Sequence, residues 1–595
     1  MATGTKPTAK PNSSNGKTSF DGRRLLDEIT QSAPWELWAE KLSSGKHTQP
    51  LHKLVPADCG PPLVWSLRES SSAEAVYLVG ELGKLRRKRR ADEPADWNGI
   101  VASWLESISQ SPLNLDGTLE YIAWASVLDR LAPRLTGEHW VALFGYLMET
   151  AVQAAHGSTL DVQQDDPETL LRDQMLAVEL PLMLGHVLPK IDACQDAWKT
   201  GRRNFASSLI DLTDGEGMVH AKLWSSYQYL LASWTRCALL CRYANSEISD
   251  DARMQLDWVV RQSLRWRRPD GSFMLETGTQ SQLSSNQLMQ TLVSAFGDRA
   301  DKAVLRLQQR NETSSLVESL DEAGEHYEWS NLALLRSNWS NDADILGIDF
   351  SRQQIRIELI AGQRRILHGA DQFSIIVDGK LLSPESSWSE NCWVSDDDVD
   401  FVELELQLSQ GWTLQRQWIV SRSDHYAYSA DALIGPQPSA VEYSRTLPLA
   451  KGVRTKDNPD TRELILRSGK RLGMLVPLGL CEWRADNRLG RFSEGRLSQR
   501  TDEATALYAP VFIDLCPKRS RKANTWRQLT VAEKRQIVTD AQAVAYRWQI
   551  GGDQWLAYRS LTPVTNRTFM GQNHNSEFVF GRFEDAELDP LVEVE

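Results

Sequence analysis

The chain has 595 residues, of which 41% are hydrophobic and 24% charged, a composition typical of a globular protein with about two to four domains. A formal net charge of −13 argues against a nucleic-acid partner, and it disfavours any polyanion unless the binding cleft is locally basic. The seven cysteines are odd in number and lack Cys-x-x-Cys spacing, which excludes a disulfide framework and favours a reducing compartment.

The first 20 residues are rich in Lys, Thr, Pro, Ser and Gly and contain no apolar core of a signal peptide. They predict a disordered leader. No run approaches the roughly 18 apolar residues of a membrane span, so we expect no membrane partner and a cytoplasmic location.

Residues 21–315 are predicted to form a helical domain. Leu25 to Lys41 is amphipathic, and Ala75 to Val79 fits either strand or helix. The basic run Lys84 to Arg90 is either an anion-binding patch or a solvated helix end, and we prefer the second reading. From Trp97 to about Gln309, apolar residues recur at i, i+3, i+4 and i+7, which predicts helical hairpins forming an incomplete α/α toroid. A solenoid of identical repeats is the weaker alternative, because no strict period is present.

After Glu325 the apolar period changes from 3.6 to 2, as in the alternation of residues 402–408. Gly551 and Gly552 separate two strand-like runs, a hairpin signal in which both glycines are expected to supply positive φ. Residues 316–595 are therefore predicted to form a large antiparallel β-sandwich. The fold class is an α+β multidomain protein, helical first and all-β second.

The stretch Trp329 to Leu382 contains Leu-Leu-Arg-Ser-x-Trp at 334–339, a predicted turn His-Gly-Ala-Asp at 368–371, and Phe-Ser-Ile-Ile-Val-Asp-Gly at 373–379. This order of pieces resembles the start of the β-sandwich domain in heparinase II/III-like proteins. The resemblance implies a polysaccharide-lyase scaffold in which the histidine-bearing turn faces the polysaccharide cleft.

Lyases of this kind cleave next to a uronic acid by β-elimination. The reaction needs a general base, a general acid and a group that neutralises the carboxylate. In the family these come from an Asn/His pair, a Tyr and a histidine of the β domain. The segment Asp214 to His220 resembles the Asn/His pair without its Asn, and Thr279 to Gln282 stands where the Tyr is expected. The resemblance thus implies His220 and His368 as catalytic residues. Tyr227 and Tyr229 follow Leu223 at helical spacing and are candidates to replace the missing base, although aromatic residues at this spacing more often belong to the core.

The remaining candidates concern substrate binding. Arg336 and Arg364 suit a carboxylate, because guanidinium groups bind carboxylates through two parallel hydrogen bonds. Trp224 belongs to a set of 22 tryptophans, a residue type on which sugar rings stack, although most of them are expected to fill the core. Asp371 and Gln280 complete the expected set of substrate-binding residues. No cofactor is expected; a structural zinc held by His368, Asp371 and His425 is a minor alternative.

These observations predict a lyase that acts on an acidic polysaccharide or oligosaccharide by β-elimination. The alternative is a non-catalytic carbohydrate-binding or assembly protein on the same scaffold. The lyase hypothesis requires His220 and His368 to approach one substrate from the helical and the β half of the chain.

Overall fold

The computed structural model describes residues 34–44, 49–86, 93–94, 96–110, 114–157, 160, 162, 166–276, 282–320, 323–485, 490–584 and 587–595. The predicted leader, residues 87–90 of the basic run and Gln280 lie outside the described residues.

Helices occupy the first half of the chain, as predicted. They are α2 (Trp35–Ser43), α3 (Ala73–Lys84), α4 (Trp97–Gln110), α5 (Leu115–Ala125), α6 (Leu128–Leu131), α7 (Gly137–Gly157), α8 (Pro167–Asp173), α9 (Leu180–Val187), α10 (Asp192–Asp211), α11 (Tyr227–Tyr243), α12 (Asp250–Arg265), α13 (Gln282–Phe296), α14 (Arg299–Arg310) and α15 (Ser315–Glu318). The ambiguous residues 75–79 lie inside α3, whose N-cap Ser72 accepts a hydrogen bond from the backbone of Ala75. None of the described helices is long and apolar enough to cross a membrane.

Strands follow from Glu325 onward, which confirms the predicted change from helical to β structure. They are β1 (Glu325–Tyr327), β2 (Leu332–Arg336), β3 (Ile345–Asp349), β4 (Arg356–Ala361), β5 (Arg364–Ala370), β6 (Gln372–Val377), β7 (Lys380–Leu381), β8 (Ser389–Ser395), β9 (Val399–Leu408), β10 (Trp412–Ser421), β11 (Tyr426–Thr446), β12 (Arg454–Asp457), β13 (Leu464–Ser468), β14 (Lys470–Pro477), β15 (Gly490–Ser493), β16 (Arg496–Asp514), β17 (Asn524–Leu529), β18 (Ala532–Glu533), β19 (Gln536–Ile537), β20 (Ala543–Ile550), β21 (Asp553–Ser560), β22 (Arg567–Phe569), β23 (Gln572–His574), β24 (Phe578–Glu584) and β25 (Glu587–Val594). All the described strand pairs are antiparallel.

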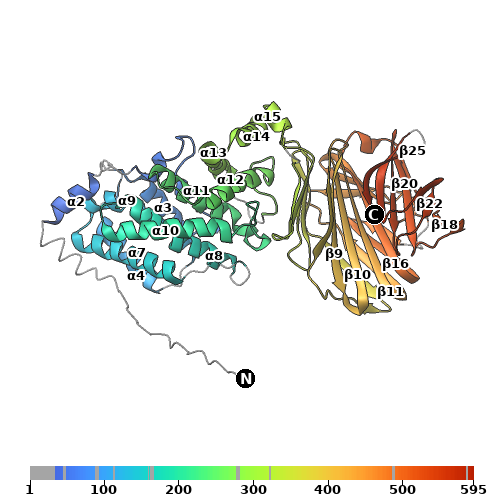
Figure 1. Cartoon of the computed structure of the whole chain (residues 1–595), viewed down its shortest axis with the longest axis horizontal. Helices are drawn as coiled ribbons and strands as arrows, with labels where there is room; N and C mark the ends of the chain where they lie inside the picture. Colours follow the sequence, from blue (N-terminus) through green and yellow to red (C-terminus); the bar gives the residue numbers. More distant parts are fainter. Residues whose placement is uncertain are drawn as a thin grey trace, which may run out of the picture. The chain divides into compact units, whose positions relative to one another are not determined.

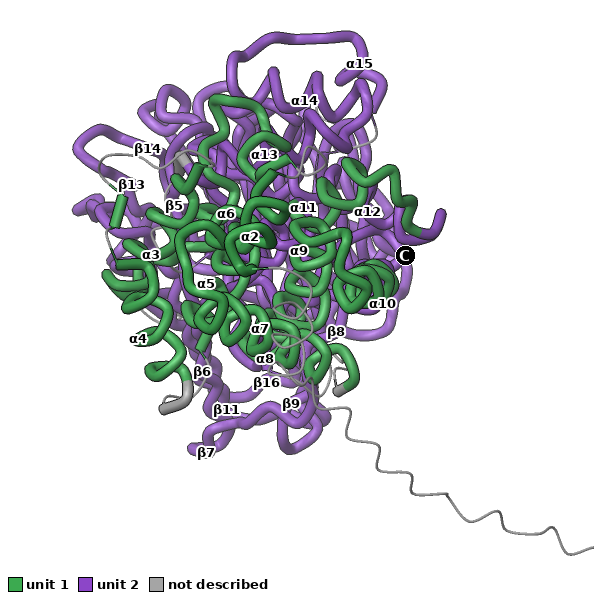
Figure 2. The backbone as a smooth tube through the Cα atoms, turned by 90° about the vertical axis from the view of Figure 1, so that its left-hand side faces the viewer, with its two compact units in different colours: residues 1–160, 168–205, 236–248 green, residues 161–167, 206–235, 249–595 purple. Residues whose placement is uncertain are grey.

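The chain forms two compact units (Figure 2). Unit 1 consists of residues 1–160, 168–205 and 236–248; unit 2 consists of residues 161–167, 206–235 and 249–595. Unit 1 is helical, and its core includes the fully buried indoles of Trp124 and Trp140. At the end of a π-helical stretch (Gln174–Glu179), the Glu179 carboxylate pairs with the Arg236 guanidinium through two hydrogen bonds, with both side chains completely buried.

Unit 2 contains the sheets. The first sheet has the strand order β1-β2-β3-β4-β5, and the largest sheet includes β9, β10, β11 and β16, which run side by side in Figure 1. The first sheet packs against one face of the largest sheet. A third sheet, β17-β20-β21-β24-β25, packs against the other face. Along β10, Trp418 and Val420 point into the core between the first and the largest sheet, whereas Ile419 points into the core between the largest and the third sheet. Successive side chains of a strand alternate between its two faces.

Two local predictions are corrected. Residues 368–370 do not form a tight turn: they end strand β5, where His368 lies opposite Glu358 and Gly369 opposite Ile357. Gly369 has a φ of 136°, a conformation that favours glycine, and it still pairs with Ile357 within the sheet. At the β20–β21 hairpin only Gly551 has a positive φ, 65°.

Candidate functional site

The candidate site lies on the face of the first sheet that points away from the sandwich core. Gly347 of β3, Glu358 of β4 and His368 of β5 are directly opposite one another, so their positions share one face. Residues 266–275 cover this face, because a Cβ at Gly347 would meet Trp266 and Met274 at 3.1–3.4 Å. Glycine at position 347 therefore allows the covering segment to approach the sheet.

Glu358 is the centre of a buried ion-pair cluster. Its carboxylate accepts hydrogen bonds from Arg268 at 2.7 and 2.8 Å and from the backbone N–H of Leu275 at 2.6 Å, and it forms an ion pair with Arg365 at 2.8 Å. The Glu358 side chain is completely buried, whereas the side chain of Arg365 is 37% exposed. Because the carboxylate has four such contacts, it holds both guanidinium groups in fixed positions.

His368 lies next to this cluster and is half-buried. Its backbone N–H donates to the carbonyl of Pro448 at 2.7 Å. The Nε2 atom is buried and has no hydrogen-bond partner among the described residues. Burial lowers the pKa of the imidazole; the nearby Glu358 carboxylate opposes this shift, and Arg365, Arg268 and Arg356 add to it. The ring is therefore poised as a neutral group that accepts a proton.

His220 is held by a different part of the same unit. It caps the short helix at residues 221–226, where Nδ1 accepts the backbone N–H of Lys222 at 3.1 Å. Because Nδ1 accepts, Nε2 carries the proton of the neutral ring and can only donate. Nε2 lies 3.2 Å from the side-chain amide of Asn331, which pairs with it through the amide oxygen. Burial also lowers the pKa of His220, which is 4% exposed.

An asparagine, Asn331, does lie beside His220, but it comes from another segment than the one in which the resemblance places the Asn/His pair. It immediately precedes β2 with a φ of 56°, a conformation that Asn tolerates better than most residues. The carbonyl of the preceding residue, Ser330, accepts the N–H of Ala221, which joins the His220 segment to this strand end. The pair therefore consists of residues that are 111 positions apart in the sequence.

The two histidines approach the same sheet at different strands. His220 lies beside the start of β2, and His368 is on β5. Three strand spacings separate these strands, about 14 Å at the level of the backbone.

Glu276 is a further buried acid near the cluster. Arg268 donates to its backbone carbonyl at 3.3 Å, while neither carboxylate oxygen has a hydrogen-bond partner among the described residues. Burial raises the pKa of Glu276 to about 8, against the opposing effect of Arg268. A carboxyl group with a pKa near neutrality, beside a charged cluster, is typical of functional sites, although structural networks also produce it.

Two aromatic candidates belong to the core. Tyr227 is 1% exposed, its hydroxyl is 2.7 Å from that of Ser263, and burial raises its pKa above the ordinary value. Trp224 stacks on Tyr227 and donates its indole N–H to the carbonyl of Met274 at 2.6 Å. In these positions neither side chain presents a surface to a sugar, so their placement does not support the predicted roles.

Two charged candidates are buried and form their hydrogen bonds within the protein. Arg336 is 1% exposed and donates to the backbone carbonyls of Asn338, Arg265 and Ser340 at 2.6–2.9 Å. Asp371 is completely buried and accepts hydrogen bonds from Arg445 at 2.6 and 2.9 Å. All of these hydrogen-bonding groups are occupied within the protein.

Three predictions remain: Arg364, Gln280 and the zinc alternative. Arg364 is exposed and lines a basic cavity at the other end of the sheet, whereas Gln280 lies outside the described residues. For the zinc alternative, His425 pairs with Asp344 at 2.9 Å and Asp371 with arginines. Among the described residues no group of three potential ligands is placed to hold a metal ion.

Sequence reasoning missed Glu358, Asn331 and Glu276. Glu358 is a charged residue inside the apolar strand Ile355 to Ile360, and a charge flanked by buried aliphatic positions is a detectable signal of a buried pair. The partnership of Asn331 with His220 carries no such signal, because it depends on a tertiary contact.

No family model and no curated protein matches this chain. Solved structures do. A heparinase III structure aligns with a TM-score of 0.63 at 10% identity, over 92% of this chain and 98% of its own. The heparan sulfate lyase HepC from Pedobacter heparinus aligns with a TM-score of 0.54 at 12% identity, over 93% and 92%. Another heparinase III gene product has a TM-score of 0.57 at 10% identity, over 91% and 98%. At these identities the likeness concerns the fold alone, and the chain has a polysaccharide-lyase-like fold over nearly its whole length.

Proposed function

We propose that the protein is a polysaccharide lyase that acts on a uronic-acid-containing glycan by β-elimination. The observation that carries the proposal is the cluster on the sheet face. It consists of an imidazole whose Nε2 has no hydrogen-bond partner among the described residues, beside a carboxylate that fixes two guanidinium groups. The fold supports it, because the structures of similar fold are described as heparinase III and heparan sulfate lyase. A neutral imidazole beside fixed positive charge suits proton abstraction next to a carboxylate.

In this proposal His368 takes the C5 proton of the uronate, the electron pair of that bond forms the C4–C5 double bond, and the C4–O bond breaks. The leaving oxygen takes up a proton from solvent water, and the protonated His368 afterwards releases its proton to solvent. Arg365 and Arg356, both half-buried near His368, neutralise the uronate carboxylate as negative charge develops on it. His220 acts as a positioning residue, because it orients the Asn331 amide at the far end of the same sheet.

The test is incubation with heparan sulfate, chondroitin sulfate and other uronate glycans, followed by the ultraviolet absorbance of unsaturated uronates. The wild-type protein is expected to produce this absorbance with at least one glycan. The H368A variant is expected to lose about 100-fold or more in kcat, which is the usual contribution of a general base. The control is H156A, because His156 is an exposed histidine of unit 1.

A non-catalytic carbohydrate-binding protein is the second candidate. Two observations favour it: Tyr227, the predicted replacement base, is buried, and the Nε2 atom of His368 is covered by protein. Glycan binding without any unsaturated product would support this candidate over the lyase.

A further inference from the structure

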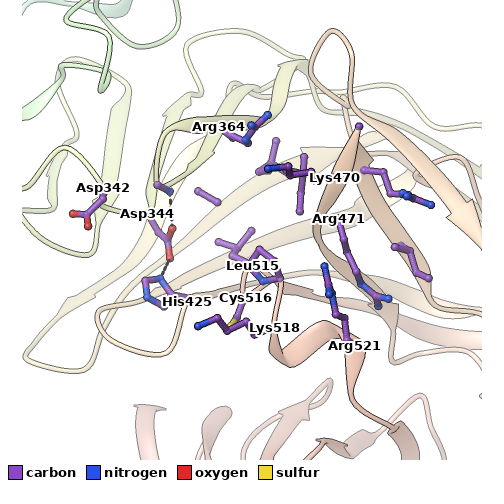
Figure 3. Close-up of a pocket in the computed structure, with 18 of the residues that line it drawn as sticks. Asp342, Asp344, Arg364, His425, Lys470, Arg471, Leu515, Cys516, Lys518 and Arg521 are labelled. Atoms are coloured by element: carbon purple, nitrogen blue, oxygen red, sulfur yellow. Dashed lines mark hydrogen bonds and ion pairs between the residues drawn. The ribbon is translucent and has the colours of Figure 1, made fainter.

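A large basic cavity (Figure 3) is lined by basic residues of unit 2. It lies at the opposite end of the first sheet from His220. It has a volume of about 1080 Å³ and is built by the β2–β3 loop, the β4–β5 turn, strands β12 to β14 and the segment that follows β16. Asp344 borders it immediately before β3, whereas the other end of β3, Asp349, lies near His220. The length of β3, about 15 Å, therefore separates this cavity from His220.

The lining carries a strong excess of positive charge, although the whole chain has a net charge of −13. Its charged residues are Arg364, Lys456, Arg467, Lys470, Arg471, Lys518 and Arg521 against Asp342 and Asp344. One of the two carboxylates is already engaged: Asp344 pairs with His425 at 2.9 Å and accepts the backbone N–H of Gly362 at 3.2 Å, as Figure 3 shows. Such a concentration of charge on an acidic protein creates a local positive potential.

Among the residues that the structure describes, most of these cations have no anionic partner. Arg471 donates to Ser520, but among the described residues no carboxylate pairs with the other basic side chains of the lining, which are exposed. They are Arg364, Lys456, Arg467, Lys470, Lys518 and Arg521. These guanidinium and ammonium groups are therefore available to a ligand.

Strand register adds a second, independent observation. Arg454 of β12 lies directly opposite Arg467 of β13, which in turn lies opposite Arg471 of β14. Like charges directly opposite on neighbouring strands are destabilising. A row of three arginines across three strands costs folding stability, and a bound anion would offset this cost.

The cavity also has an apolar floor. Ile366, Leu472 and Leu515 are each at most 6% exposed, and Ile465 adjoins them. An apolar base with cationic groups around it suits a ligand that has apolar ring faces and anionic substituents, more than it suits inorganic phosphate.

We propose that this cavity is a second binding site for an acidic oligosaccharide, whose sulfate or carboxylate groups pair with Arg467, Lys470 and Arg521. The assignment of a sugar as the ligand rests on the proposed function. The assignment of negative charge to the ligand rests on the cationic lining of the cavity itself. The site holds a glycan chain at a distance from His368 and takes no part in bond cleavage.

Cys516 lines the cavity and provides a local reporter, with the exposed Cys481 as an internal reference. The experiment measures alkylation of both thiols by iodoacetamide, using mass spectrometry of the full chain. Heparan sulfate oligosaccharide and unsulfated oligogalacturonate are added in separate arms. We expect at least one of them to slow alkylation of Cys516 and to leave Cys481 unaffected.

The R467Q/K470Q/R521Q variant is expected to bind that oligosaccharide about tenfold more weakly, from three exposed ion pairs of about 0.5 kcal/mol each. The matched control is K380Q/R527Q/K534Q, which removes the same charge from exposed positions elsewhere in unit 2. If the triple variant fails to fold, K470Q alone replaces it, with an expected loss of about twofold.

Equal alkylation of Cys516 with and without both oligosaccharides would overturn the proposal, as would full protection in the cavity variant. Stronger protection by a single-stranded oligonucleotide than by either glycan would overturn the sugar assignment. Failure of the lyase proposal has a separate signature: the wild-type protein yields no unsaturated product from any glycan, while the oligosaccharide still protects Cys516.

Discussion

Glu276 shows how a single buried carboxyl group makes the stability of the protein depend on pH. Its pKa is about 8 in the folded protein, against an ordinary value of 4.5, because burial disfavours the charged form. An acid whose pKa is raised by folding stabilises the protein below the unfolded pKa. This contribution is lost as the pH rises through the folded value.

We predict that E276Q removes this loss. The wild-type protein should lose about 1.4 kcal/mol of unfolding free energy for each pH unit between about 4.5 and 8 from this group, whereas the variant should not. Urea denaturation at pH 5 and pH 8 measures the difference. The control is E247Q at an exposed position of unit 1, and an identical pH dependence of E276Q and wild type would contradict the prediction.

Glu358 gives a second prediction. The E358Q substitution leaves the buried guanidinium of Arg268 without its carboxylate, and breaking a buried ion pair costs about 3–5 kcal/mol. Chemical denaturation should show this loss. The matched control is D196N, which breaks the exposed Lys199–Asp196 pair and should cost less than about 1 kcal/mol. Equal effects of the two substitutions would show that the Glu358 cluster contributes little to stability.

At the residue scale the sequence singled out both histidines as candidates, because the order of motifs around them is local, and their catalytic role stays a prediction. It could not separate Arg336 and Asp371 from functional charges. An arginine that donates to backbone carbonyls and one that faces a ligand have the same sequence appearance. Burial distinguishes them, and burial depends on the packing of segments that are distant in the chain.

At the scale of elements, periodicity was a reliable guide. The helical period from Trp97 to Gln309 matches α4 to α14, and the change to a period of two coincides with the first strand. The predicted turn at residues 368–371 was wrong, because Gly369 was interpreted as a turn residue although glycine also pairs within strands. Register, which sets Glu358 opposite His368, is a property of two strands together and could not be inferred from either alone.

The arginine row of β12, β13 and β14 makes a prediction at this scale. Without a ligand, R467Q should raise the unfolding free energy by about 0.5 kcal/mol, because it removes the central charge of three facing arginines. Thermal unfolding at low ionic strength should show a higher Tm, and the difference should shrink as salt is added. R527Q, at an exposed position on β17, is the control. A lower Tm for R467Q would show that the row is not repulsive.

At the scale of the molecule, helix gives way to strand between Glu318 and Glu325, close to the predicted boundary at residues 315/316. The compact units divide differently, because unit 2 combines all the sheets with helices α12 to α15 and residues 206–235. Periodicity detects a change of secondary structure, but it does not detect which helices share a core with a sheet.

Two units with separate buried ion pairs should unfold in two steps. We expect calorimetry to resolve two transitions. E179Q should lower one of them, by leaving Arg236 unpaired in unit 1, and D371N should lower the other, by weakening the pairing of Arg445 in unit 2. A single transition that shifts equally in both variants would show instead that the whole chain unfolds as one cooperative unit.

The discontinuous path of the chain has a consequence for synthesis on the ribosome. The ribosome synthesises His220, Trp224 and Tyr227 well before their partners. The carbonyl that Trp224 bonds, that of Met274, follows 50 residues later, and Asn331, the partner of His220, follows 111 residues later. At about 5–20 residues per second, the wait for Met274 alone lasts several seconds. During that time the growing chain exposes the aromatic segment at residues 220–227. All residues of unit 1 have been synthesised once the chain has reached residue 248. This segment is therefore the place where a chaperone would be needed first.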